Sequence, residues 1–263
     1  MEKDLYLKDY LVSRILSFGK EVPGYGRVYY RTNEDLDIIY RDLDFHKKKV
    51  LSVLASSDQV FTARYLGAET VDSFDKNRLT IYYYYLRKWS IKYREQLFPK
   101  VLGKNNNWLK KLLSCVKAES VEEEKALEFF KKHVKEGTAF YNMFYEDHLD
   151  DTKGRTLYSS ASLLKPTIDK EMKFVDFDIF GENKVDDTYD IVLISNILEW
   201  ARGDKEKFTI ARDNLNKLLN RDGLVVCSSL INRSESTILS ERRIFDENFT
   251  CREYSEGYVY HKK

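Results

Sequence analysis

Short apolar runs that end in small or acidic residues recur along the chain, and they predict the strands of a parallel sheet. The run Val50–Leu54 ends in the loop Ala55-Ser56-Ser57-Asp58, and Thr70–Phe74 ends at Asp75. Tyr189–Ser195 is apolar almost throughout, which is typical of a strand that is buried on both faces. Further strands are predicted at Met172–Phe177 and Leu224–Leu230, with a final antiparallel pair at Phe245–Phe249 and Glu256–His261.

Between these runs, apolar residues recur at helical spacing. The alternation of strands and helices with short connections predicts a doubly wound, mostly parallel α/β sheet, for which we expect seven strands. We expect residues 1–48 to form an N-terminal helical segment that covers the site, and 49–263 to form one α/β domain with a helical insertion at about 99–153. Helices are predicted at 1–20, Leu36–Tyr40, Arg78–Phe98, Asn107–Lys117, Val121–Lys135, Thr138–Glu146 and Asp204–Asn220, with a turn at Leu219–Gly223.

The segment Lys49–Asn77 has the order of elements found in nucleoside-binding units: strand, tight loop, helix, and a second strand that ends in an acid. In such units the loop and the helix N-terminus bind the charged end of the ligand, and the acid binds the ribose hydroxyls. Because the carboxyl ends of parallel strands meet at one edge of a sheet, the strand ends are expected to line one crevice. These strand ends are Ala55–Asp58, Asp75, Asp178, Ser195–Asn196 and Ser228–Ser229.

The first loop, Ala55–Asp58, contains no glycine, and this absence limits which nucleoside ligands the unit can bind. The GxGxxG pattern of dinucleotide sites and the GxxxxGK[ST] pattern of phosphate-binding loops are both absent from the sequence. S-adenosylmethionine depends less on a glycine-rich loop, because it has a carboxylate and an ammonium group in place of a pyrophosphate. Backbone amides at a helix N-terminus, together with an acid, can hold these two charges. Asp58 lies where it can accept a hydrogen bond from the ammonium or simply cap the helix.

Composition argues against several other classes of protein. A formal net charge of +1 provides no global field toward nucleic acid. No apolar run approaches the roughly 20 residues needed to cross a bilayer. The four histidines are scattered without the spacing of metal ligands, so no metal site is expected. Three cysteines without a CxxC motif indicate free thiols, and the N-terminus lacks a signal-peptide pattern, so we expect a cytoplasmic protein.

The segments VLSVLASSDQVFTARYLGAETVDSFDKN, YDIVLISNILEW and LLNRDGLVVCSSL resemble the class I methyltransferase fold. More narrowly, the chain resembles the bacterial family related to S-adenosylmethionine:diacylglycerol 3-amino-3-carboxypropyl transferases. RVYYRTNEDL, at 27–36, is similar to that family's Phe-Thr-Thr-Glu-Asn motif. The resemblance spans about residues 25–98 and 172–230. It implies an S-adenosylmethionine-dependent transfer of a methyl or 3-amino-3-carboxypropyl group to a small-molecule or lipid-like acceptor.

Carried over position by position, the resemblance assigns cofactor contacts to the strand ends and leaves the catalytic residue unknown. Ser56, Ser57 and Asp58 fall on the methionine-binding loop, Asp75 with Asn77 on the ribose side, Asp178 on the adenine side, and Ser195 and Asn196 beside the sulfonium. Tyr30, Thr32 and Trp200 are the candidates on the acceptor side. The chain departs from the family pattern at Ser57, where the family has glycine, and at Arg78, where it has proline. Ser57 therefore needs a backbone conformation that residues other than glycine rarely adopt.

Each assignment has a structural alternative. Asp75 can cap the following helix, and Ser195 with Asn196 can cap the next turn. The four tyrosines Tyr82–Tyr85 surround the helix, so at least two of them must lie in the core. For the whole chain, the alternative is a non-catalytic binding protein whose cofactor loop has degenerated. An RNA methyltransferase is third, because runs such as Glu122-Glu123-Glu124 offset the basic residues of the insertion.

Overall fold

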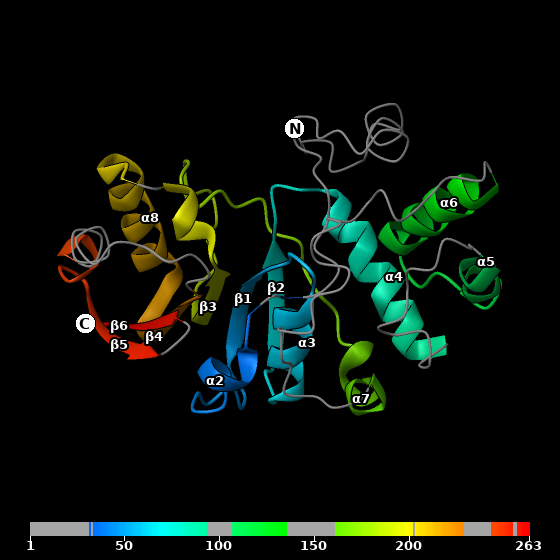
Figure 1. Ribbon diagram of the computed structural model, residues 1–263, viewed down its shortest axis with the longest axis horizontal. Helices are drawn as coiled ribbons and strands as arrows, with labels where there is room; N and C mark the ends of the chain where they lie inside the picture. The colour runs from blue at the N-terminus through cyan, green and yellow to red at the C-terminus, as the bar shows by residue number, and fades with distance from the viewer. Residues whose placement is uncertain are drawn as a thin grey trace.

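The described part of the chain folds around a six-stranded sheet with the strand order β2-β1-β3-β4-β6-β5 (Figure 1). The computed structural model describes residues 32, 34–93, 107–135, 161–201, 203–228, 243–254 and 257–263. Neighbours among β1 to β4 pair in parallel, whereas β6 pairs antiparallel to both β4 and β5. The strands are β1 Lys49–Val53, β2 Thr70–Phe74, β3 Tyr189–Ser195, β4 Leu219–Ser228, β5 Phe249–Tyr254 and β6 Gly257–Lys262.

Helices cover both faces of the sheet. One face packs against α3 (Asp58–Tyr65) and α4 (Leu79–Tyr93), and the opposite face packs against α8 (Lys205–Leu218). In Figure 1, α5 and α6 lie beyond α4, on its side away from the strands. The other helices are α2 Leu36–Tyr40, α5 Asn107–Leu113, α6 Val121–Lys135, α7 Lys165–Ile168, and the short 3-10 helices η4 Ala161–Leu164 and η5 Ile197–Ala201.

The two-residue period of the strands divides the core into two clusters. Val50, Ile191 and Leu193 point to the cluster that contains α3 and α4, whereas Leu51, Val192 and Ile194 point to the cluster that contains α8. Successive side chains of a strand point to opposite faces of the sheet, and helices cover both faces here. Side chains on both faces are therefore buried, which is why these strands are continuous apolar runs in the sequence. This confirms the doubly wound arrangement around the parallel strands.

The turn predicted at Leu219–Gly223 lies inside a strand. β4 begins at Leu219, directly after α8, but its pairing with β3 jumps from Leu219 opposite Tyr189 to Leu224 opposite Ile191. The residues between Leu219 and Leu224 are therefore an irregularity of the β3–β4 pair rather than a separate connection. The predicted turn is therefore wrong, because these residues belong to a strand, although the regular pairing with β3 is interrupted at them.

The seventh strand is not confirmed among the described residues. Met172–Phe177, where a strand was expected, makes one parallel bridge, between Phe174 and Ser73 of β2. The Ser73 N–H donates to Lys173 O (2.9 Å), and the Val175 N–H donates to Ser73 O (2.7 Å). The Phe177 N–H then bonds back to Val175 O at 3.0 Å, so the chain turns away before a ladder forms.

Most predicted helices are confirmed where the structure describes them. α2 and α6 have the predicted bounds, and α4 begins at Leu79. The predicted helices at 1–20 and Thr138–Glu146 lie outside the described residues. All four tyrosines Tyr82–Tyr85 are buried in the core, which assigns them to packing. A search of the described helices finds none long and apolar enough for a bilayer span.

Candidate functional site

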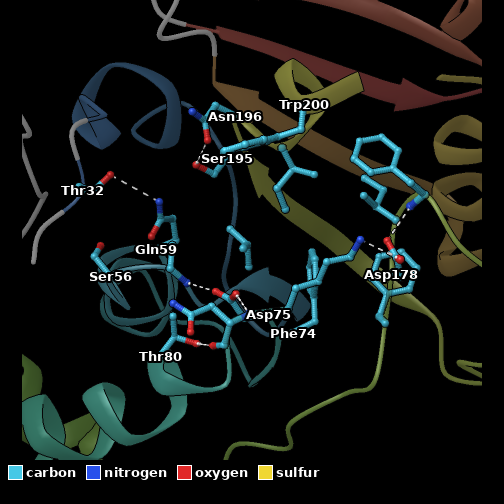
Figure 2. Close-up of a pocket in the computed structure, with 18 of the residues that line it drawn as sticks. Thr32, Ser56, Gln59, Phe74, Asp75, Thr80, Asp178, Ser195, Asn196 and Trp200 are labelled. Carbon is cyan, nitrogen blue, oxygen red and sulfur yellow. Dashed lines mark hydrogen bonds and ion pairs between the residues drawn. The ribbon is translucent and has the colours of Figure 1, made fainter. Parts of the chain in front are cut away.

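A pocket of about 620 Å³ opens at the carboxyl ends of β1, β2 and β3 (Figure 2). The sheet order places β1 between β2 and β3, so the chain leaves β1 toward one neighbour and later returns on its other side. In open α/β sheets such a switch point forms the ligand crevice. The volume lies within the range of small-molecule sites, roughly 300–1,000 Å³.

Most of the residues predicted for the site lie on the wall of this pocket. Those that line it are Ser56, Asp75, Asn77, Asp178, Ser195, Asn196, Thr32 and Trp200. Ser57 and Asp58 are buried behind the wall and are not among the lining residues. Tyr30 lies outside the described residues. The predicted convergence is therefore present for the ends of β1, β2 and β3 and for Asp178, whereas the two residues that follow Ser56 point elsewhere. Ser228, at the end of β4, is buried and is not among the lining residues, and Ser229 lies outside the described residues.

Asp75 ties the end of β1 to the turn after β2. Its Oδ2 accepts from the Ala55 N–H (2.9 Å), and its Oδ1 accepts from the Asn77 N–H (2.7 Å). The position near the start of α4 is instead capped by Asn77, whose Oδ1 accepts from the Leu79 N–H at 3.2 Å. Burial raises the pKa of the Asp75 carboxyl to about 6, although these hydrogen bonds act in the opposite direction. The Thr80 hydroxyl is a third hydrogen-bond partner of this carboxyl. A carboxylate has about four acceptor positions, so Asp75 keeps about one for a ligand hydroxyl.

An apolar slot lies beside Asp75. Phe74 and Phe177 meet edge to face, with ring centroids 5.0 Å apart, and Ile179 and Phe180 also line the pocket. Asp178 stands at the rim of this slot, where its Oδ2 pairs with Lys76 Nζ at 2.9 Å (Figure 2). Flat apolar walls with a few polar groups at their edge suit a planar heteroaromatic ring.

Three residues other than glycine adopt a left-handed backbone around the pocket. They are Ala55 (φ 40°), Ser57 (φ 71°) and Ser195 (φ 52°). Ser195 lies where the β3–β4 register shifts between Leu193 and Ser195, an irregularity that can re-aim the last side chain of a strand. Such conformations cost about 1–3 kcal/mol each and cluster at functional sites. The predicted demand on Ser57 is therefore confirmed, since the serine adopts the conformation for which glycine is suited.

Replacing Ser57 with glycine is expected to raise the free energy of unfolding by about 1–2 kcal/mol, because glycine adopts this conformation without steric cost. The Ser57 Oγ is buried without a hydrogen-bond partner, so its loss removes no bond. Urea titration measures the change. Ser56→Gly is the matched control, and it should destabilise the fold because the Ser56 Oγ donates to Asp58 Oδ2 at 2.9 Å. A decrease for Ser57→Gly would contradict this account of the loop.

Asp58 is committed to a buried ion pair. Its Oδ1 lies 2.7 Å from Arg87 Nη2 of α4, and its Oδ2 accepts from the Thr32 N–H at 2.7 Å. Arg87 also donates to the Ser56 carbonyl and lies over the Phe61 ring at 5.1 Å. The N-cap position of α3 is Ser57, whose side chain makes no capping hydrogen bond. Asp58 fixes the loop and the segment before α2 rather than facing the pocket.

Glu34 is a pocket residue to which the sequence analysis assigned no role, although it lies in the segment 27–36. The side chain is 1% exposed, yet it lines the pocket. Its carboxylate accepts from the Ser195 hydroxyl, from Gln59 Nε2 at 3.1 Å and from Ser228. Burial raises the pKa of the Glu34 carboxyl above its ordinary value. The signal in the sequence was an acid beside the apolar start of Leu36–Tyr40, but its partners lie far away along the chain.

Trp200 marks the outer rim of the pocket. It is 74% exposed, on η5 directly after the β3 strand end (Figure 2). The neighbouring Glu199 is buried, and it is not among the residues that line the pocket. An exposed indole at the mouth of a pocket offers an apolar contact surface to a ligand that reaches outward.

No protein-family model and no curated protein matches this chain. Among solved structures it is similar to a methyltransferase from Pyrococcus furiosus, at 8% identity and a TM-score of 0.44, over 97% of this chain and 98% of that one. It is also similar to a TehB-like SAM-dependent methyltransferase from Corynebacterium glutamicum, at 9% identity and a TM-score of 0.43, over 96% and 94% of the two chains. A third is the N-methyltransferase NodS from Bradyrhizobium japonicum in complex with S-adenosyl-L-homocysteine, at 10% identity and a TM-score of 0.37, over 97% and 85%. Such low values assign no activity to this chain, so the site itself must carry the functional conclusion.

Proposed function

We propose that this protein is a cytoplasmic S-adenosylmethionine-dependent transferase that moves a methyl or 3-amino-3-carboxypropyl group to a small-molecule or lipid-like acceptor. One observation carries the proposal. An acid at the end of β2, an apolar slot beside it, and the polar end of β3 share one pocket at the switch point of the sheet. The acid suits a ribose, the apolar slot suits a nucleobase, and the polar strand end suits the reacting centre of the same ligand.

Different residues of the pocket contact different parts of S-adenosylmethionine in this proposal. Asp75 accepts from the ribose hydroxyls, and Asn77 lies beside it. Phe74 and Phe177 hold the adenine ring, with Asp178 at its polar edge. Ser56 meets the methionine end, while Ser57 and Asp58 act from behind the wall by shaping the loop. The unpartnered Oε1 of buried Gln59, which lines the same wall, fits a ligand that brings hydrogen-bond donors to this end.

The β3 end faces the acceptor. Ser195 and Asn196 would position the nucleophile, and Thr32 and Trp200 would contact the body of the acceptor. When bound, S-adenosylmethionine supplies a carbon already activated by its positive sulfur, so that alignment of the nucleophile provides much of the rate. The chain up to residue 48 would cover the site, since Thr32 and Glu34 form part of the pocket wall.

Isothermal titration of the purified protein with S-adenosylmethionine and S-adenosylhomocysteine tests the proposal. We expect both to bind, and NADH, whose pyrophosphate finds no glycine-rich cradle, not to bind. Absence of binding by both sulfur nucleosides at millimolar concentration would overturn the proposal. Once an acceptor is found, the nucleoside product identifies the group transferred: S-adenosylhomocysteine follows methyl transfer, and 5′-methylthioadenosine follows 3-amino-3-carboxypropyl transfer.

A non-catalytic binding protein is the second candidate, and the first loop favours it. Ser57 stands in a left-handed conformation, and Asp58 is bonded to Arg87 instead of to a ligand. If this loop no longer binds the methionine end of the ligand, Ser57→Gly should raise the affinity for S-adenosylhomocysteine sharply. An unchanged affinity in that variant, with measurable binding by the wild type, favours the enzyme.

A further inference from the structure

The pocket contains a buried acid that the resemblance does not assign. Glu34 lies on the segment before α2, and its carboxylate accepts hydrogen bonds from Ser195 of β3, Gln59 of α3 and Ser228 of β4. All three donors are neutral. The charged side chain that acts on the Glu34 carboxyl is Asp58, which has the same sign. Among the described residues no cation bonds to Glu34, so its carboxylate, once ionised, is a buried negative charge without a cationic partner.

A buried carboxylate of this kind is costly unless a cation joins it. Neutral hydrogen bonds recover only part of the hydration that the charge has lost. The nearby Asp58 is already neutralised by Arg87 at 2.7 Å, so that guanidinium is engaged elsewhere. Burial raises the pKa of the Tyr40 hydroxyl, and the Glu34 carboxylate adds to that rise. A ligand that brings a positive group to Glu34 would relieve this cost.

Gln59 provides a second, independent observation at the same place. Its side chain is 1% exposed and lines the pocket, and its Nε2 donates to Glu34 while its Oε1 has no hydrogen-bond partner. An ammonium group has three N–H donors and no acceptor. The Glu34 carboxylate and the free Gln59 oxygen together offer the acceptors that such a group requires.

We propose that Glu34 and Gln59 form the ammonium subsite of the pocket, and that Glu34 takes over the role that the resemblance gives to Asp58. This inference rests on the proposed function, because the ammonium is that of the amino-acid portion of S-adenosylmethionine. Asp58 is removed from that role by its bond to Arg87. The negative charge is supplied instead by Glu34, near Thr32, whose N–H donates to Asp58 Oδ2 of the first loop.

The test compares Glu34→Gln with the wild type against two ligands. One is S-adenosylhomocysteine, and the other is its deamino analogue, in which hydrogen replaces the amino group. The wild type should prefer S-adenosylhomocysteine by roughly 10- to 100-fold, as expected for one hydrogen bond to a charged group. Glu34→Gln should lose most of this preference while keeping its affinity for the deamino analogue. Because serine hydroxyls can accept as well as donate, the glutamine fits the existing network.

Glu182→Gln serves as the matched control, since it makes the same chemical change at an exposed acid that does not line the pocket. This variant should retain the preference for the amino group, and thermal melts should show that all three proteins are folded. An equal weakening of both ligands in Glu34→Gln, or no change in either, would overturn the ammonium subsite and leave the proposed function standing. Failure of the wild type to bind S-adenosylhomocysteine would overturn the proposed function, and the subsite with it.

Discussion

Replacing Arg87 with methionine should lower the free energy of unfolding by about 3–5 kcal/mol, as is typical when one partner of a buried ion pair is removed. The guanidinium bonds to Asp58 and to the Ser56 carbonyl, and both members of the pair are almost fully buried. Methionine fills similar space but removes the buried positive charge that lies 2.7 Å from Asp58 Oδ1. Urea-induced unfolding, monitored by circular dichroism, measures the loss.

Two further variants make this test specific. Lys184→Met removes the cation of an exposed pair with Glu182 (3.3 Å) and should change the stability by less than about 1 kcal/mol. The double variant Asp58→Asn with Arg87→Met removes both charges of the pair, so it should recover part of the loss. A single Arg87→Met variant that is as stable as the wild type would show that the pair does not hold the loop.

Asp75→Asn should weaken S-adenosylhomocysteine binding by roughly 10- to 100-fold, since ligand hydroxyls would lose a charged acceptor. The matched ligand is the 2′,3′-dideoxy analogue, which lacks both ribose hydroxyls and should bind wild type and variant alike. Isothermal titration with the two ligands separates loss of the diol contact from general damage to the loop. Equal weakening for both ligands would contradict a direct contact between Asp75 and the ribose.

The pH dependence of the same residue gives an independent measurement. Because the pKa of Asp75 is about 6, the carboxylate is mostly ionised at pH 7 and mostly protonated at pH 5. The affinity for S-adenosylhomocysteine should therefore fall roughly tenfold between pH 7 and pH 5, and this component should disappear in Asp75→Asn. The contribution of Asp75 to the stability of the unliganded protein runs the other way. An acid with a raised folded pKa stabilises the fold fully below its unfolded value near 3.8, and this contribution is lost as the pH rises through about 6.

Local patterns account for the parts of the fold and site that the sequence predicts well. β2, β3 and α6 have the expected bounds, because a run of apolar residues or a helical stripe needs only its own residues to be recognised. The convergence of Asp75 and Ser195 on one pocket follows from the rule that parallel strands end at a common edge.

Contacts between distant segments account for what the sequence does not predict. Glu34 meets Ser195 across a separation of 161 residues, and Arg87 of α4 captures the Asp58 side chain from a different helix. Neither contact produces a periodic pattern of residues in the sequence that would reveal it. The sequence does show that an acid follows Ser57, but it does not show whether that acid turns toward a ligand or toward an arginine.

The short segment that bridges Ser73 also bears on how copies of this chain meet one another. The outer edge of β2 would otherwise present free N–H and C=O groups, and such edges invite strands of other molecules to add to a sheet. At Ser73 both backbone groups are already bonded, to Lys173 and Val175. A single bridge thus interrupts the edge while leaving no new long strand exposed. Loss of this contact would leave both backbone groups of Ser73 open to a strand from another copy of the chain.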